Sequence, residues 1–486
     1  MGPTRMSSGP KRALLFLAVG VSLASRPAAA QIDSALASKL SFNLTNPGGK
    51  SLAMGGAFTA IADDSTAALA NPAGLGLLSS IEFGVSGKRI DETIGLVTAR
   101  STAIGSLTAP WGPITPSDSR ISLQSSSLEY AGIVFPISKR LVFALSYAEN
   151  LRFEGEADAG GYQYIEFRDN RSGGSTRRDI LYEFREYGSV SLRNQLGAFS
   201  AGYRLSERVR IGAGVTLNRT SFDLEGDPSG PHRIVHRTFT SPVSSVTRTV
   251  TMSVEGFGGT KTAFLAGIHA DLDAKGTFSV GAAYRSAART EGTFVIGGDV
   301  PASLQGKERR PFAFSVPSDA SAGLAVRPIP GLTVALEGQW IDYGGTFDVP
   351  LPVASYSGLV GPPPGVFIDG ALATVSPARS AWVPRAGVEY VATAGTTRIA
   401  FRLGYHREPK RGITEELVVR DGSGTPYPIT DPPFSDGVAT VFDGGKAEDR
   451  FSGGLGLTFG RSLSVDAAFD VGRDASRFAA SLFWRF

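Results

Sequence analysis

Three residues late in the chain have the side chains and the spacing to bind an acidic group. Arg402 and His406 are four residues apart, and Arg385 precedes them in a segment of similar pattern. Side chains four residues apart on an extended strand lie on the same face, and a fixed guanidinium binds a carboxylate through two parallel hydrogen bonds. Glu337 and Glu389 are predicted to face the same side, so pairing among these charges is the alternative to ligand binding.

Motifs of enzymes and metal sites are incomplete in this sequence. Gly84-Val85-Ser86-Gly87 lacks the second spacer of a nucleophile elbow, and Gly48-Gly49-Lys50-Ser51 lacks the upstream glycine of a phosphate-binding loop. His232 and His236 have a spacing that suits a metal only on a helix, yet their segment is rich in Pro and Arg. We therefore predict that the protein is not an enzyme and holds no metal or cofactor.

Charge and cysteine content exclude further classes. The chain has 48 Lys and Arg against 45 Asp and Glu, and it has no block basic enough to bind nucleic acid. With no Cys in 486 residues, disulfides, thiolate metal sites and Cys nucleophiles are excluded. Residues 1–30 are predicted to be an export signal, because Lys11 and Arg12 precede the apolar run 13–23 and small residues follow at 28–30.

From residue 81 to the end, short segments alternate apolar and polar residues, as strands with two different faces do. The predicted strands are 81–90, 120–135, 139–150, 188–204, 207–225, 247–271, 276–290, 312–327, 331–343, 380–391, 395–407, 449–460, 462–470 and 475–486. Short turns connect them in alternation with the long segments 91–119, 151–187, 226–246, 291–311, 344–379 and 408–448. Short periplasmic turns and long outer loops are typical of a transmembrane β-barrel. We therefore predict an all-β fold, a transmembrane antiparallel barrel of about fourteen strands in a bacterial outer membrane.

The last predicted strand shows the two faces most clearly. Phe478 and Trp484 share one face, which we expect to contact lipid, whereas Arg477 and Ser481 lie on the other. Charged side chains are costly in hydrocarbon, so the second face belongs in a wet lumen. The terminal Phe486 is similar to the aromatic signal by which barrel-assembly machinery recognises its substrates, and it predicts that machinery as a partner.

Residues 31–80 do not alternate, and they contain the densest motif in the chain. That motif is Met54-Gly55-Gly56-Ala57-Phe58-Thr59-Ala60-Ile61-Ala62-Asp63-Asp64-Ser65, followed by Asn71-Pro72-Ala73-Gly74-Leu75. A barrel of this size has a lumen wider than its own side chains fill, and a segment rich in Gly and Ala can pack there with its backbone close to the wall. Asn71 and Pro72 are predicted to fix a turn, and Asp63 and Asp64 to cap local structure. We predict a plug, or hatch, over 31–80 inside a barrel formed by 81–486.

This motif resembles the N-terminal hatch of the FadL/TodX-type outer-membrane transporters of long-chain fatty acids. Later segments are also similar to that family, namely 314–317, 323–328, 331–334, 339–340, 384–390 and 402–405. The resemblance implies passive uptake of fatty acids or other hydrophobic small molecules, with lateral exit from the barrel into the bilayer. It further implies ligand contacts by Arg385, Arg402 and His406, and by Phe58 of the hatch. Residues 141–147 contain neither Gly nor Pro and so depart from the family's kinked strand, which leaves the position of the exit open.

The expected partners follow from this interpretation. They are a hydrophobic small molecule, outer-membrane lipid, and lipopolysaccharide, whose phosphates the arginines between 168 and 178 would contact. We expect a monomer and no nucleic acid. The alternative is a secretion-associated or structural barrel that binds a protein partner through external loops such as 408–448.

Overall fold

The structure is a computed structural model, and the residues it describes are 46–95, 99–101, 120–169, 176–227, 232–238, 244–248, 250–298, 309–346, 371–376, 380–409, 414–419, 438–443, 447–473 and 475–486. The predicted export signal and the first part of the predicted hatch, 31–45, lie outside these residues. Fourteen strands form the wall of a barrel: β1 (Glu82–Gly95), β3 (Arg120–Pro136), β4 (Leu141–Asp169), β5 (Thr176–Arg204), β6 (Val209–Asp227), β10 (Thr260–Asp271), β11 (Phe278–Arg285), β14 (Asp319–Val326), β15 (Leu332–Ile341), β17 (Ala381–Ala394), β18 (Thr397–Glu408), β21 (Glu448–Phe459), β22 (Leu463–Val471) and β23 (Ala475–Arg485).

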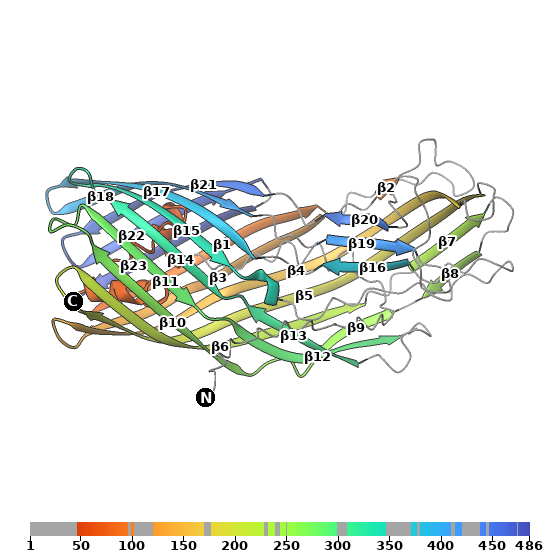
Figure 1. Ribbon diagram of the computed structural model, residues 1–486, viewed down its shortest axis with the longest axis horizontal. Helices are drawn as coiled ribbons and strands as arrows, with labels where there is room; N and C mark the ends of the chain where they lie inside the picture. Colours follow the sequence, from red (N-terminus) through yellow and green to blue (C-terminus); the bar gives the residue numbers. More distant parts are fainter. Residues whose placement is uncertain are drawn as a thin grey trace, which may run out of the picture.

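The wall closes on itself. Each of these strands pairs antiparallel with the next wall strand along the chain, and the last, β23, pairs with β1 from Glu82↔Arg485 to Glu92↔Ala475 (Figure 1). The predicted closed antiparallel barrel of fourteen strands is therefore confirmed.

Alternation along the wall strands separates an apolar outside from a polar inside. On β18, Leu403 is 70% exposed and Phe401 is 51% exposed, whereas Arg402 between them is buried. Phe469 and Trp484 continue the apolar exterior on β22 and β23. A closed barrel with an apolar outer belt leaves no strand edge for lipid to contact, so this barrel lies in a bacterial outer membrane. In the part of the chain that the structure describes, no helix is long and apolar enough to cross a bilayer.

The predicted outer loop 151–187 is instead mostly strand. β4 and β5 each have 29 residues, and their ladder runs without interruption from Leu151↔Asn194 to Asp169↔Thr176 (Figure 1). A hydrogen-bonded ladder does not need lipid, so the pairing extends past the apolar belt. Further strands lie at this outer end: β2 (Ala99–Ser101), β7 (His232–Thr238), β8 (Ser244–Arg248), β9 (Val250–Glu255), β12 (Ala288–Gly298), β13 (Arg309–Val316), β16 (Ala371–Ser376), β19 (Thr414–Val419) and β20 (Val438–Asp443).

Three strands predicted as continuous are broken near the outer rim. The segment 312–327 is divided at Pro317-Ser318, 276–290 is divided at 286–287, and 247–271 is divided at 256–259. Pro317 has no N–H to donate, and 256–259 contains three glycines, so neither stretch continues a ladder well. The outer portions β9, β12 and β13 form a separate three-stranded sheet.

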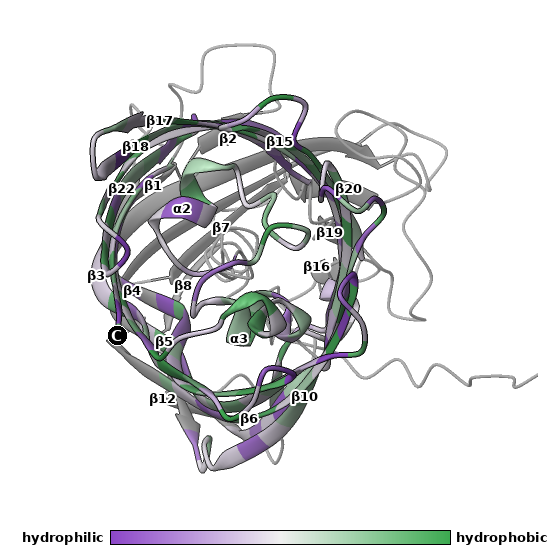
Figure 2. Cartoon of the chain, turned by 90° about the vertical axis from the view of Figure 1, so that its left-hand side faces the viewer, coloured by the Kyte–Doolittle hydropathy of each residue, from purple (hydrophilic) through white to green (hydrophobic). Residues whose placement is uncertain are grey.

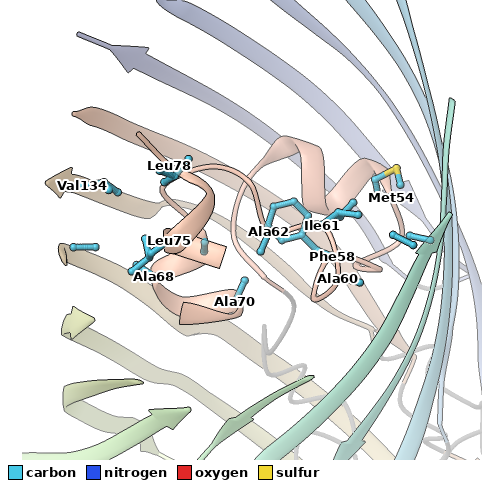
Figure 3. Close-up of a cluster of buried hydrophobic side chains, with 14 of the residues drawn as sticks. Met54, Phe58, Ala60, Ile61, Ala62, Ala68, Ala70, Leu75, Leu78 and Val134 are labelled. Atoms are coloured by element: carbon cyan, nitrogen blue, oxygen red, sulfur yellow. The ribbon is translucent and has the colours of Figure 1, made fainter. Parts of the chain in front are cut away.

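Residues 46–80, called the inner segment here, lie within the ring of strands (Figure 2). This segment contains two short helices, α2 (Gly49–Ala53) and α3 (Ala67–Ala70), and the 3-10 helix η1 (Pro72–Leu77), with a second 3-10 turn η3 (Tyr343–Gly345) elsewhere in the chain. Met54, Phe58, Ile61 and Leu75 form its apolar core together with wall residues such as Val134 (Figure 3). The interior of the barrel therefore has a packed core of its own.

Candidate functional site

The hatch motif brings the backbone of the inner segment against the backbone of the wall. Gly55 and Gly56 have φ angles of +64° and +79°, which favour glycine. A Cβ on Gly55 would lie 2.7 Å from the backbone nitrogen of Tyr405, and a Cβ on Gly404 would overlap the backbone nitrogen of Gly55. The two chains touch here without side chains between them, as the composition of the motif predicts.

Carboxylates on the wall accept hydrogen bonds from the backbone of the inner segment. Glu337 Oε2 on β15 accepts from the N–H groups of Phe58 at 2.9 Å and Thr59 at 2.8 Å. On β1, Glu82 Oε1 accepts from Ser65 N at 2.6 Å. These acids face inward because the lumen side of each strand alternates with the lipid side, and backbone N–H groups satisfy their charge.

Other wall side chains bond to carbonyl oxygens of the inner segment. Their contacts come from strands all around the ring: Tyr130 Oη to Ser65 O at 2.6 Å, Ser200 Oγ to Ala68 O at 2.7 Å, Arg204 Nη2 to Gly76 O at 2.7 Å, His269 Nε2 to Ala60 O at 3.1 Å and Ser452 Oγ to Ala53 O at 3.2 Å. Polar groups from many strands hold the inner segment, so the segment could leave the lumen only if these bonds broke together.

Asn71 joins the turn of the inner segment to the wall. Its Oδ1 accepts from Ala73 N at 3.2 Å, and Pro72 occupies the first position of η1. The Asn71 Nδ2 donates to Thr59 O at 2.9 Å and to Ile268 O of β10 at 3.0 Å. The predicted capping by Asn71 and Pro72 is confirmed.

Arg402 lies in the lumen wall between two acids. Its Nε donates to Glu389 Oε2 at 2.6 Å and its Nη1 donates to Asp466 Oδ1 at 2.5 Å, and the residue is only 8% exposed. Lys50 of the inner segment lies 3.9 Å from Glu389 Oε1 and donates to both carboxylate oxygens of Asp63 at 2.9 Å. Pairing among wall charges is thus present at this position, and contact between Arg402 and a ligand stays a prediction.

Arg385 of the wall and Phe58 of the inner segment both lie in the packed interior of the barrel. Arg385 Nη1 donates to Gly55 O at 3.3 Å, its Nη2 donates to Gln339 Oε1 at 2.5 Å, and Glu337 lies opposite it in the β15–β17 ladder. The Phe58 side chain is fully buried in the core of the inner segment. Ligand contact by Arg385 and by Phe58 stays a prediction.

His406 lies beside Arg385 in the β17–β18 ladder, and it is buried. Its Nε2 is 3.9 Å from Glu408 Oε1 and its Nδ1 is 3.9 Å from Asp470 Oδ1, distances too long for direct hydrogen bonds. Within the described ranges, no group of three or more His, Asp or Glu side chains is placed to hold a metal. The side chains of His232 and His236 lie outside the described residues.

A buried cluster next to His406 did not emerge from the sequence. Arg450 pairs with Asp470 at 2.7 Å, and Arg477 pairs with Glu408 at 2.6 Å. The signal was nevertheless present, because Arg450, Asp470 and Arg477 each occupy the lumen parity of their strands. Only the ladder between β21, β22 and β23 shows that they meet.

We expect the stability of the inner segment to depend on pH through Asp64. Burial, together with the neighbouring charges of Asp63 and Glu82, raises the pKa of Asp64 to about 7. The folded protein then holds a proton that the unfolded chain has lost. This contribution to the free energy of unfolding is therefore full below about pH 4 and is lost as the pH rises to about 7. Urea unfolding at several pH values should show this slope in the parent protein and a flatter one in Asp64→Asn. Asp91→Asn, at an exposed carboxylate, is the control, and equal slopes in all three proteins would contradict the assignment.

No protein-family model matches the sequence, and no curated protein matches it. Several solved structures are similar to the chain over most of its length. A FadL homologue of Pseudomonas aeruginosa is 14% identical, with a TM-score of 0.55 over 92% of this chain and 99% of that one. The toluene transporter TbuX of Ralstonia pickettii is 14% identical, with a TM-score of 0.51 over 91% and 99%. A deltaS2 mutant of TodX, a monoaromatic hydrocarbon channel of Pseudomonas putida, is 12% identical, with a TM-score of 0.51 over 91% and 99%. The chain thus has the fold of the FadL-type transporters, as its sequence resemblance predicts.

Proposed function

We propose that this protein is a passive outer-membrane transporter for hydrophobic small molecules, in which the inner segment acts as a plug. The fold is that of a FadL homologue and of a transporter named for toluene, which supports this proposal. The bonds between the inner segment and many wall strands also support it, since a segment held in the lumen from many sides suits a plug. The predicted ligand contacts of Arg385, Arg402, His406 and Phe58 belong to the same proposal.

The observation that carries the proposal is where the β3–β4 ladder ends. β3 begins at Arg120 and β4 extends to Asp169, but among the described residues their pairing runs only from Pro136↔Val142 to Tyr130↔Ala148. Beyond that point, in the described part of the chain, β3 pairs with β1 alone, whereas β4 pairs with β5 and, at 162–164, also with β2. Register shifts occur at the same level in both flanking ladders, between Ser86 and Gly87 and between Glu149 and Leu151.

Lateral exit at this break would suit an apolar cargo. A molecule that leaves between β3 and β4 enters the bilayer directly and does not cross the periplasm. Each CH₂ group that moves from water into lipid contributes about 0.8 kcal/mol, so partitioning alone supplies the driving force. An aqueous pore offers no such gain.

Two measurements on the intact protein test the proposal. In planar bilayers the protein should conduct few ions if the inner segment acts as the proposed plug. Cells that express it, in a host without other hydrophobe transporters, should take up radiolabelled toluene or oleate faster than cells with the empty vector. High conductance, or uptake equal to the empty vector for every hydrophobic compound, would contradict transport and would favour a barrel that binds a protein partner.

Closing the β3–β4 break should stop uptake. The chain has no Cys, so the variant Leu128→Cys/Glu149→Cys carries the only two thiols, one on each strand just beyond the last ladder pair. Joining them with a short bismaleimide linker that contains a disulfide should lower uptake about tenfold, since the exit is then bridged. Reduction of the linker should restore the original rate.

The matched control is Ile133→Cys/Leu145→Cys, at positions that already face each other in the paired part of the same ladder. The linker should leave its uptake unchanged, because no opening exists there to close. If the linked Leu128/Glu149 variant transports as fast as the unlinked one, the exit lies elsewhere in the wall.

A further inference from the structure

One column of the lumen wall is free of charge. On β5, Leu192, Asn194, Leu196 and Ala198 face inward at every second position, and all four are buried. Their ladder partners on β6 are Phe222, Thr220, Asn218 and Thr216 respectively. These eight residues, called the neutral stripe here, contain only apolar, amide and hydroxyl side chains.

The amides and hydroxyls of the neutral stripe satisfy one another. Asn194 Nδ2 donates to Thr220 Oγ1 at 2.9 Å, and Asn150 Nδ2 of β4 donates to Asn194 Oδ1 at 3.3 Å. Asn218 Nδ2 donates to Thr216 Oγ1 at 2.8 Å. An apolar molecule passing these groups would not leave an ionised side chain without its partner.

The neutral stripe connects two apolar regions. At its outer end Phe222 packs against Phe257 and Phe312, with ring centroids 6.0 and 5.7 Å away. Phe257 lies between Gly256 and Gly258, whose φ angles are +64° and +155°, so the turn that covers this end is built from residues with few steric constraints.

The inner end of the neutral stripe reaches the break in the wall. Leu196 and Ala198 belong to an apolar cluster with Leu69, Tyr130 and Ala148. Tyr130 and Ala148 are the last pair of the β3–β4 ladder. The column of uncharged residues therefore runs from the outer aromatic residues to the proposed exit. There the buried acids Glu129 and Glu149 are already paired, with Lys88 at 3.6 Å and with Arg193 at 3.1 Å.

Elsewhere in the described lumen, including the start of β6, buried cations are paired with acids. The buried cations and their nearest acids are Lys88 with Glu129 at 3.6 Å, Arg210 with Asp271 at 2.8 Å, Arg402 with Asp466 at 2.5 Å, Arg450 with Asp470 at 2.7 Å and Arg477 with Glu408 at 2.6 Å. A carboxylate that approached any of these cations would have to displace an acid already bound to it.

Arg385 is the best remaining candidate for an anionic ligand, because its guanidinium donates to two neutral oxygens, those of Gly55 and Gln339. However, Glu337 lies opposite Arg385 in the ladder, and the Arg385 guanidinium contacts the backbone of Gly55. A second carboxylate at this position would face the charge of Glu337 in a site with little water, where like charges repel strongly.

We propose that the cargo of this barrel is uncharged, a hydrocarbon or a neutral ester or alcohol, and that it passes along the neutral stripe to the β3–β4 break. This inference rests on the proposed function and restricts it to one class of substrate. An ionised carboxylate on the same route would lose its water without gaining a cation, which is strongly unfavourable. A neutral molecule of the same length loses little hydration free energy on this route.

The test compares matched neutral and ionised compounds on the unaltered protein. Cells that express it should take up toluene and methyl decanoate about tenfold faster than benzoate and decanoate at a pH where both acids are ionised. Equal or faster entry of the ionised members would overturn the inference while leaving transport intact. If none of the four enters faster than in cells with the empty vector, the proposed function itself fails.

A variant pair locates the route. Asn194→Asp places a negative charge in the centre of the neutral stripe and should lower toluene uptake about tenfold. Thr458→Asp adds the same charge at a lumen-facing position of β21, outside the stripe, and should leave uptake unchanged. Heat-modifiable migration on gels verifies that both variants fold. Equal uptake by the two variants would place the route elsewhere, and if Asn194→Asp does not fold, Asn218→Asp makes the same test.

Discussion

Replacing Gly404 by valine is expected to displace the inner segment and open the barrel to ions. A Cβ at this position overlaps the backbone nitrogen of Gly55 and approaches the carbonyl carbon of Met54 to 2.5 Å. Backbone atoms cannot rotate away as a side chain can, so the cost should reach about 3 kcal/mol or more, at the upper end for an overpacked core. We expect lower resistance to urea and ion conductance raised about tenfold or more, because a barrel of this size whose interior is not occupied encloses a water-filled lumen.

Gly197→Val is the matched control for this prediction. Gly197 is an outward-facing, exposed strand glycine, and a Cβ added to it would meet no atom within 4 Å. Valine favours strands, so the control should conduct as little as the parent protein. If Gly404→Val stays closed to ions and keeps its stability, the inner segment does not depend on this backbone contact.

Replacing Arg402 by methionine should be the most destabilising single loss of charge in the described lumen. Glu389 and Asp466 would both remain buried without the cation they share. Breaking a buried ion pair from one side typically costs about 3–5 kcal/mol, because the abandoned charge keeps its desolvation penalty. Urea unfolding of the purified protein in lipid vesicles measures this loss.

Removing the acids as well should recover much of the stability. The triple variant Arg402→Met/Glu389→Gln/Asp466→Asn leaves no unpaired charge, so it should be more stable than Arg402→Met alone. Arg89→Met is the control, since Arg89 and Asp91 form an exposed pair whose loss should change little. A triple variant no more stable than Arg402→Met would show that shape, and not charge, makes Arg402 important.

The sequence allowed the barrel wall to be predicted because lipid and lumen impose opposite demands on neighbouring residues. Phe401 and Leu403 had to face lipid, and Arg402 therefore had to face inward, whatever the rest of the fold was. The glycines of the hatch motif likewise predicted a close backbone contact, although its partner on the wall, Gly404, was not evident.

Contacts between distant segments could not be predicted in this way. That Glu337 accepts the N–H of Phe58 depends on how the inner segment is oriented in the ring, which alternation does not encode. The end of the β3–β4 ladder was also hidden, because residues 120–135 and 139–150 both have ordinary strand patterns. The extension of β4 and β5 was missed because charged residues within 151–187 suggested a loop, whereas outside the membrane a strand tolerates them on either face.

The seam between β1 and β23 has a consequence for the order in which this molecule is assembled. The ring closes only when the last strand pairs with the first, yet Gly49 near the start of the inner segment bonds to Ser481 on that last strand. A segment already in place when the seam seals needs no path through the open ends of the ring. We therefore expect the amino-terminal part to fold back among the earlier strands before the final hairpin is added, so that closure of the barrel encloses it.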